Sequence, residues 1–548
     1  MAGRTRRDNA GTSRTRFALG SRSAATMDTS RRSLSYTVAL ALLAAGALAV
    51  ALAALPYKTF DLDRFFVPKE LVLHAAAALT ALVLLWRAPR LELTRIDTLL
   101  VAFLGLSLLS AVLSTNWWLA WRALAVSLSG VAVFWCAGAV ARGGRRDALV
   151  SWLVLGVVAA CVTALLQAYG VQSDYVSLNR APGGTLGNRN FVAHLAAIAT
   201  PALLWRTLGA RTTWGARAGT AGVMVLAAIL TLSRTRAAWL ALAVCVPIAV
   251  IGVIAGHRTW RRSTAAARSG RLAAALGATV LAAMFVPNKL NWKSDSPYLD
   301  SVRGVVDYRA GSGKGRLVQY KNSLRLASAH PVLGVGPGNW SVRYPSVATP
   351  NDPSIDADDG MTANPWPSSD WMADLAERGA PAAACLGVVF IGLYVTGLMA
   401  MSPRAGSDEF AQGLVLVVTT VIVVVAGSFD ALLLLPAPAL IVWGLLGALA
   451  VPSRTRVSID LTAGRRAAAL ALVLALGVAA AGRSAAQAVA MQLVERDGRT
   501  VAMERAASLD PGSYPIQMRL ATLDARRGRC DGVRQHAGAA HELFPAAP

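Results

Sequence analysis

The chain has 548 residues, of which 55% are hydrophobic and only 15% are charged. Soluble domains carry about 25% charged residues, so the composition excludes an ordinary soluble enzyme and predicts a large membrane domain. The formal net charge of +24 would suit a nucleic-acid binder, but the basic residues follow the ends of the apolar segments, so no nucleic acid is expected as a partner.

Thirteen apolar segments are candidates for membrane spans, which need about 20 apolar residues each. They cover residues 35–55, 67–86, 97–114, 119–141, 147–169, 190–205, 218–232, 237–256, 272–287, 381–401, 410–427, 432–451 and 467–482. The sequence therefore predicts an all-α fold, a polytopic helix bundle of about 12–13 spans in the cytoplasmic (inner) membrane.

The basic residues orient this bundle, because Lys and Arg accumulate on the cytoplasmic side of membrane proteins. Residues 1–34 and the linkers after every second span hold 27 of them. The opposite short loops hold only seven, which are Lys58, Arg64, Lys69, Arg180, Arg189, Arg234 and Arg236. We therefore expect a cytoplasmic N-terminus, with an Arg-rich, disordered tail over residues 1–34.

A long loop interrupts the membrane domain between spans 9 and 10. The expected division is a first membrane part over 35–287, an extracytoplasmic loop over 288–380 and a second membrane part over 381–482. The spacing of apolar residues predicts one loop helix over 316–329 and a second from about Ser368 to Arg378, capped by Ser368 or Ser369 and ended by Gly379. Asn351–Pro367 is expected to be irregular.

The C-terminal tail, residues 483–548, is expected to be helical and extracytoplasmic. Ala506, Leu509 and Pro511 recur 34 residues later as Ala540, Leu543 and Pro545, a spacing that resembles a tetratricopeptide unit. One such unit cannot bury its apolar face alone, so the tail is expected to pack on the membrane domain or on a protein partner. Two unrelated helices that both end in Leu-x-Pro remain the alternative.

Several arginines break the expected charge asymmetry by lying near the outer ends of spans or in outer loops: Arg122, Arg180, Arg189, Arg234, Arg236 and Arg316. The guanidinium group binds phosphate oxygens in a bidentate manner. The cluster therefore indicates a site for an anionic group such as a diphosphate at the outer leaflet, or else anchoring to lipid phosphates and helix ends. His74 and His194 are interpreted as packing residues, and the cysteines have no metal-ligand spacing.

Four stretches together resemble the O-antigen ligase/polymerase family of bacterial membrane glycosyltransferases. Gly184–Phe191 is similar to the family's G-T-x-G-N-x-N-F segment, and Ser233–Leu240 to its S-R-G-A-W-L turn. The stretch from Arg316 to Trp340, with Gly334, Gly336 and Gly338 in its loop turn, resembles the R…P-L-L-G-x-G-x-G-x-F signature. Asp370–Gly379 resembles the end of the family's H-N-x-Y-L…E-x-G helix.

The resemblance implies transfer of a glycan from a polyprenyl-diphosphate carrier to an acceptor hydroxyl at the outer face of the membrane, with no metal and no cofactor. The acceptor is a glycan, a lipid or a protein. Carried over by position, Arg236 and Arg316 are the expected catalytic arginines, and the diphosphate-binding set is Arg180, Arg234, Arg236 and Arg316.

One position departs from the family pattern, because the family histidine falls on Ser368. Serine alone is a poor general base near neutral pH. The base is therefore expected to be absent or to be supplied elsewhere, with Asp370 and Glu377 as the candidates. Two other functions stay open, namely an inert assembly protein for surface polysaccharide and a transporter of lipid-linked glycans.

Overall fold

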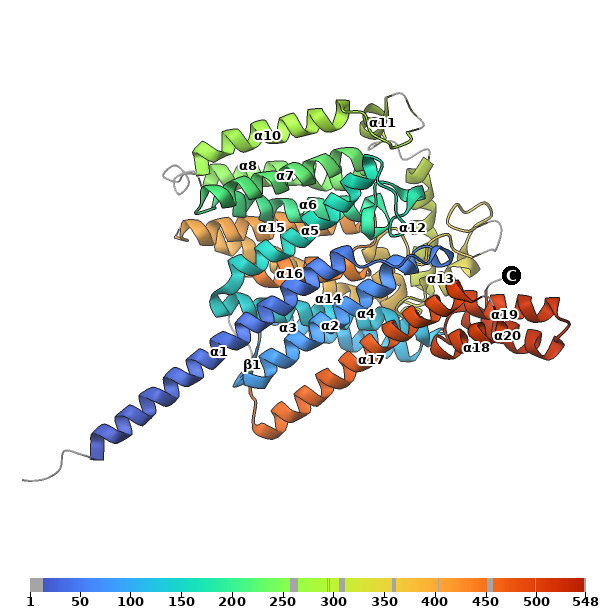
Figure 1. Ribbon diagram of the computed structural model, residues 1–548, viewed down its shortest axis with the longest axis horizontal. Helices are drawn as coiled ribbons and strands as arrows, with labels where there is room; N and C mark the ends of the chain where they lie inside the picture. Colours follow the sequence, from blue (N-terminus) through green and yellow to red (C-terminus); the bar gives the residue numbers. More distant parts are fainter. Residues whose placement is uncertain are drawn as a thin grey trace, which may run out of the picture.

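The computed structural model describes residues 13–546 except 257–264, 293, 295, 305–310, 357–360, 403, 451–456 and 498. Long helices run side by side through a bundle, and small helices gather at one end of it (Figure 1). The elements are α1 (Ser13–Leu52), α2 (Asp63–Arg87), β1 (Arg90–Leu93), α3 (Arg95–Val112), α4 (Trp117–Val140), α5 (Arg146–Ala168), α6 (Arg189–Leu208), α7 (Thr213–Ser233), α8 (Arg236–Ala255), α10 (Ala265–Phe285), α11 (Pro297–Arg303), α12 (Gly311–Ala329), α13 (Trp340–Arg343), α14 (Asp370–Ala400), α15 (Ser407–Gly427), α16 (Pro436–Leu449), β2 (Val457–Asp460), α17 (Ala463–Arg496), α18 (Thr500–Leu509), α19 (Tyr514–Arg526) and α20 (Cys530–Leu543).

Each of the thirteen predicted segments coincides with a helix, so the prediction of a polytopic membrane helix bundle is confirmed. Among the described residues, ten segments are long and apolar enough to cross a membrane, and one of them, Trp117–Ala168, contains both α4 and α5. The predicted spans 272–287 and 432–451 correspond to α10 and to the shorter α16. Residues 13–34 of the tail that was expected to be disordered form the start of α1.

Several membrane helices begin where a side chain can satisfy the first free N–H groups, which have no water partner inside a bilayer. Thr94 forms a capping box with Asp97 at the start of α3. Asn116 accepts from Leu119 N before α4, and Asn188 accepts from Asn190 N before α6. These residues fix where each helix starts, and so which side chains lie at the bundle end.

The centre of the bundle is α16, in which every residue is buried. The non-helical residues 428–435 that precede α16 are themselves mostly buried, and non-helical backbone is tolerated beside a short span where protein surrounds it. The outer helices instead expose large apolar side chains, such as Ile251 and Ile254 on α8 and Ile391 on α14. An apolar belt of this kind is typical of a lipid-facing surface.

Loops that the charge rule assigns to one side of the membrane lie at the same end of the bundle. Helices α11, α12 and α13 of the long loop lie at the end that also carries α18, α19 and α20 (Figure 1). We call this the loop end.

At the other end of the bundle β1 and β2 pair antiparallel, with Arg90 opposite Asp460, so the linkers after α2 and α16 lie together. This two-stranded sheet is the one pair of strands among the described residues and an exception to the all-α prediction.

The two predicted loop helices are present with shifted boundaries. The first, α12, begins at Gly311 rather than at Arg316. The second is the start of α14, where Ser369 and not Ser368 is the cap and accepts from Met372 N. Gly379, at φ +80°, kinks α14 instead of ending it, and the helix continues as the tenth predicted span.

The tail packs on the membrane domain through buried charges. Arg122 of α4 donates to Glu70 and Asp63 of α2, at 2.8 and 2.6 Å. Arg483 of α17 lies 3.7 Å from the other oxygen of Glu70. Burial raises the pKa of Asp510, at the end of α18, against the opposing charge of Arg483. The tail is therefore attached to α2 through Glu70, while its tetratricopeptide character stays a prediction.

Candidate functional site

Three arginines meet at the loop end, and we call Arg189, Arg234 and Arg236 the arginine cluster. Only two residues separate α7 from α8, and Arg234 closes α7 in the left-handed region, at φ 52°. Its Nε donates to Ser301 Oγ at 2.9 Å, and Arg236 Nη1 donates to the carbonyl of Gly304. Both arginines of the turn are thus directed toward α11.

The charges of the cluster act on one another across Trp292. The guanidinium carbon of Arg234 lies 4.5 Å from the centre of the Trp292 ring, and that of Arg189 lies 5.7 Å from it. Burial lowers the pKa of Arg234, and the nearby charge of Arg189 lowers it further, while Asp300 partly opposes this shift. Like charges held together at partial burial favour the binding of an anion.

Arg316 belongs to the same region and comes from α12. Its charge acts on His194 of α6. One turn further along α12, the hydroxyl of Tyr320 donates to the carbonyls of Ser368 and Ser428, both within hydrogen-bond distance. The helix that carries Arg316 is therefore fixed to the start of α14 and to the end of α15.

A carboxylate lies beside this region in the segment between α15 and α16. Asp430 Oδ2 accepts from the Asn190 side chain at 3.2 Å and lies 3.9 Å from His194 Nδ1. Asn190 Oδ1 in turn accepts from Thr235 Oγ1 at 3.2 Å, and Thr235 lies between the two arginines of the turn. Asp430 is thus connected by two hydrogen bonds to Thr235, in the turn that carries Arg234 and Arg236.

Of the predicted diphosphate-binding set, Arg234 and Arg236 lie together in the turn between α7 and α8. Arg316 lies close enough to His194 for its charge to act on that ring, and Arg180 has another contact. Arg180 forms an ion pair with Asp61 at 3.2 Å. Its guanidinium is therefore directed toward the segment between α1 and α2. Arg122 is also engaged, in the ion network with α2 described above.

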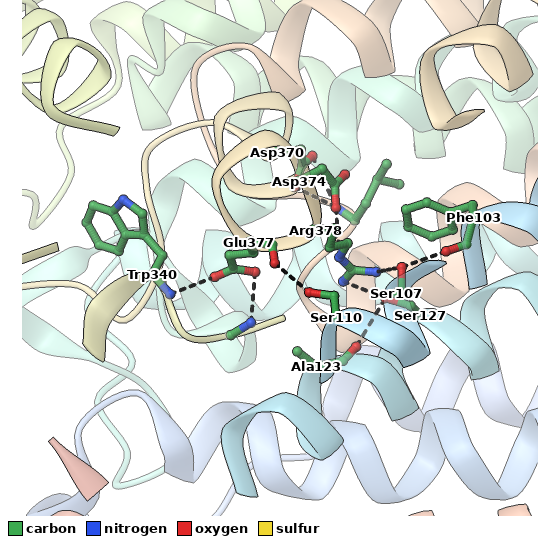
Figure 2. A network of polar contacts seen from close by, with 12 residues as sticks. Phe103, Ser107, Ser110, Ala123, Ser127, Trp340, Asp370, Asp374, Glu377 and Arg378 are labelled. Carbon is green, nitrogen blue, oxygen red and sulfur yellow. Dashed lines mark hydrogen bonds and ion pairs between the residues drawn. The ribbon is translucent and has the colours of Figure 1, made fainter. Parts of the chain in front are cut away.

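The carboxylates predicted as bases make contacts with the backbone. Asp370 accepts hydrogen bonds from Leu432 N and Leu433 N at 2.9–3.1 Å. Glu377 accepts from Gly338 N at 2.8 Å and from Trp340 N at 3.2 Å, which Figure 2 shows beside the contacts of Arg378. Both carboxylates hold segments of backbone in place, and their catalytic roles stay predictions.

The glycine turn fits against α14, against Ser114 in the segment between α3 and α4, and against the start of α4 at distances that exclude a side chain. Gly334, Gly336 and Gly338 all have positive φ, and a Cβ on Gly334 would lie 2.3 Å from the carbonyl carbon of Glu377. Gly336 N also donates to the carbonyl of Glu377 at 2.8 Å. The turn is therefore a close contact between the long loop and the membrane domain.

Three residues near the cluster escaped the sequence analysis: Asn190, Trp292 and Asp430. Asp430 carries the clearest signal, because it is the one acidic residue between 410 and 450, and an ionisable residue beside a membrane span is a candidate functional residue. His194 was interpreted as packing, but neither of its ring nitrogens has a hydrogen-bond partner among the described residues. No group of three or more potential metal ligands occurs in the described part of the chain.

The sequence model of the O-antigen ligase family matches residues 221–387. This stretch contains the turn between α7 and α8, Arg316 and the glycine turn. The chain therefore carries an O-antigen ligase family domain, and the resemblance read from the sequence motifs is confirmed. A search of curated proteins found no match to the chain.

Proposed function

We propose that this membrane protein of the O-antigen ligase family transfers a glycan from a polyprenyl-diphosphate carrier to an acceptor hydroxyl at the outer face of the cytoplasmic membrane. The observation that carries the proposal is the convergence of Arg189, Arg234 and Arg236 at the loop end, with Arg316 close enough to act on His194 of α6. In the expected orientation of the chain, the loop end faces outward.

The arginines supply the chemistry that such a transfer needs. As the acceptor oxygen attacks the anomeric carbon, the bond from that carbon to the phosphate oxygen breaks, and negative charge grows on the diphosphate. Guanidinium groups fixed before the reaction stabilise this charge without reorganisation. Trp292 and Ser301 hold Arg234 in place, so part of the cluster is fixed in the absence of a substrate.

The experiment is a transfer assay with the purified protein and a polyprenyl-diphosphate-linked oligosaccharide. The donor is supplied alone, where a second donor molecule serves as acceptor, and also with a lipid-linked acceptor. Release of polyprenyl diphosphate together with a longer glycan is the readout. Because each charge-assisted hydrogen bond contributes about 1.5–3 kcal/mol, Arg236→Ala and Arg316→Ala are each expected to reduce transfer roughly 10- to 100-fold.

One control variant separates the cluster from a general effect of charge, and a second variant tests Arg180. Arg206→Ala removes an arginine that pairs with Asp147 at 2.7 Å. Arg206 lies near the end of α6, just after the predicted span 190–205, on the side expected to be cytoplasmic. Arg180→Ala removes the predicted ligand that pairs with Asp61. Arg206→Ala is expected to keep full transfer, and a loss in it equal to the losses in Arg236→Ala and Arg316→Ala would contradict the proposal. A loss in Arg180→Ala would include Arg180 in the diphosphate site, and full transfer would exclude it.

The serine at position 368, where the family pattern has a histidine, favours a second candidate function. In this function the protein binds lipid-linked glycans without transferring them. The backbone of Ser368 is held by Gln319 and Tyr320, and its side chain offers no strong base. Donor binding that depends on Arg236, with no transfer to any acceptor supplied, would favour this assembly role over the enzyme.

A further inference from the structure

We propose that Asp430 is the general base that takes the proton from the acceptor hydroxyl. This inference rests on the glycan transfer proposed above and supplies the group that is missing at Ser368. It is carried by the position of one carboxylate relative to the arginine cluster, and by the engagement of the other carboxylates nearby.

The acidic side chains near the start of α14 are enclosed. Asp370, Asp374 and Glu377 keep 0, 2 and 1% of their surface exposed, and Asp430 keeps 8%. Asp374 also pairs with Arg378 at 3.0 Å. A general base must come within hydrogen-bond distance of the hydroxyl that it deprotonates. Of these four carboxylates, Asp430 is the one that retains a surface for that contact.

Asp430 also has the surroundings of a positioned base. One oxygen accepts from the backbone N–H of Ala431 at 2.9 Å, and the other accepts from Asn190. His194 is fully buried behind it, with Nδ1 3.9 Å from Oδ2. His194 therefore faces Asp430 and cannot itself contact an acceptor.

The segment that carries Asp430 is fixed on both sides. Before it, Ser369 Oγ donates to the carbonyl of Gly427, and Tyr320 donates to the carbonyl of Ser428. After it, Asp370 accepts from Leu432 N and Leu433 N. On this interpretation Asp370 is a positioning residue, because it holds the backbone of the segment while Asp430 performs the proton transfer.

The proposed step balances without a further reactant. Asp430 takes the proton of the acceptor O–H as the acceptor oxygen bonds to the anomeric carbon. The bond from that carbon to the diphosphate oxygen breaks, and its electron pair leaves with the diphosphate beside the arginine cluster. The proton then passes from Asp430 to water or to the departing diphosphate, which restores the carboxylate.

The test compares Asp430→Asn with the wild type in donor binding and in the rate of transfer as a function of pH. General-base catalysis contributes roughly 10²- to 10⁴-fold, so Asp430→Asn is expected to lose that much transfer. Binding of the polyprenyl-diphosphate donor should stay within about threefold of wild type. Asp430→Glu keeps a carboxylate and is expected to recover part of the rate, with a shifted acidic limb of the pH profile.

The matched control is Asp408→Asn, which makes the same substitution at an exposed position in the first turn of α15. It is expected to leave both the rate and its pH profile unchanged. Asp300→Asn tests the rival carboxylate on α11, which is exposed and acts on Arg234. Transfer that survives in Asp430→Asn, or that is lost in Asp300→Asn instead, would overturn the inference.

The failure of the proposed function looks different from the failure of this inference. If the wild-type protein transfers no glycan, both the proposed function and the role of Asp430 are contradicted. If the wild-type protein transfers glycan and Asp430→Asn is equally active, only the role of Asp430 as the base is contradicted. If Asp430→Asn does not fold, Asp430→Glu decides the matter, because a folded variant with an unshifted pH profile contradicts the role of Asp430.

Discussion

Replacing Glu377 by glutamine tests whether this side chain holds the glycine turn. Each carboxylate oxygen accepts one backbone N–H, with Gly338 N 2.8 Å from Oε2 and Trp340 N 3.2 Å from Oε1. Glutamine has the same length but only one acceptor oxygen, so its NH₂ group faces one of the two N–H groups. One charge-assisted bond is lost and a buried N–H is left without a partner, so Glu377→Gln should lower the free energy of unfolding by about 2–4 kcal/mol.

The assay is unfolding of the purified protein in detergent, followed by heat or denaturant. Glu409→Gln is the matched control, because Glu409 lies exposed in the first turn of α15, and it should leave the midpoint unchanged. Transfer measured at low temperature, where Glu377→Gln stays folded, should keep the wild-type pH profile. An unchanged midpoint together with a loss of transfer and of its acidic limb would refute this reasoning and make Glu377 the base.

Three further substitutions have expected effects on stability, each measured as the midpoint of unfolding in detergent. Gly336→Ala should be strongly destabilising, by about 2–4 kcal/mol, because φ is +104° and the new Cβ would lie 2.3 Å from Ser114 Cβ. Arg122→Met should cost about 3–5 kcal/mol, because it leaves Glu70 and Asp63 without their closest cation. Asp510→Asn should stabilise the protein at neutral pH, because burial raises the pKa of this carboxyl in the folded state.

The pH dependence of the last variant follows from the direction of its shift. A carboxyl whose pKa is higher in the folded than in the unfolded state makes the protein lose stability as pH rises from the unfolded pKa, about 3.9, through the folded pKa. The gain from Asp510→Asn should therefore vanish at acid pH. Gly482→Ala, in the exposed middle of α17 where a Cβ meets no atom within 4 Å, is the control for Gly336→Ala. A gain that does not change with pH, or equal effects of the two glycine variants, would contradict these predictions.

The sequence predicted the membrane helices well because most of them are long apolar runs separated by short polar segments. What it could not distinguish is apolar surface that faces lipid from apolar surface that faces other helices. The segment 432–451 has the composition of a lipid-facing span, yet α16 is buried throughout its length. The pairing of β1 with β2 was also beyond prediction, because two four-residue strands more than 360 residues apart carry no local signal.

The candidate site was predicted in part. The arginines of the turn and Arg316 break the charge asymmetry, and that local signal is visible in one sequence. The contacts of Asp370 and Glu377 depend on where distant backbone N–H groups lie, which composition and spacing do not indicate. Asp430 was overlooked because its interest as a candidate base depends on its contacts with Asn190 and His194. Both residues are more than 200 positions away in the sequence, so spacing does not indicate these contacts.

The ion network between α2, α4 and α17 bears on how the chain enters the membrane. Glu70 is synthesised 52 residues before Arg122, and a carboxylate alone in an apolar helix is costly at membrane depth. Insertion of α2 is therefore favoured when α4 follows and supplies the arginine, so the two helices are expected to settle as a pair. Arg483 is synthesised long after both residues, and a chain that stops before α17 leaves Glu70 with Arg122 but without Arg483.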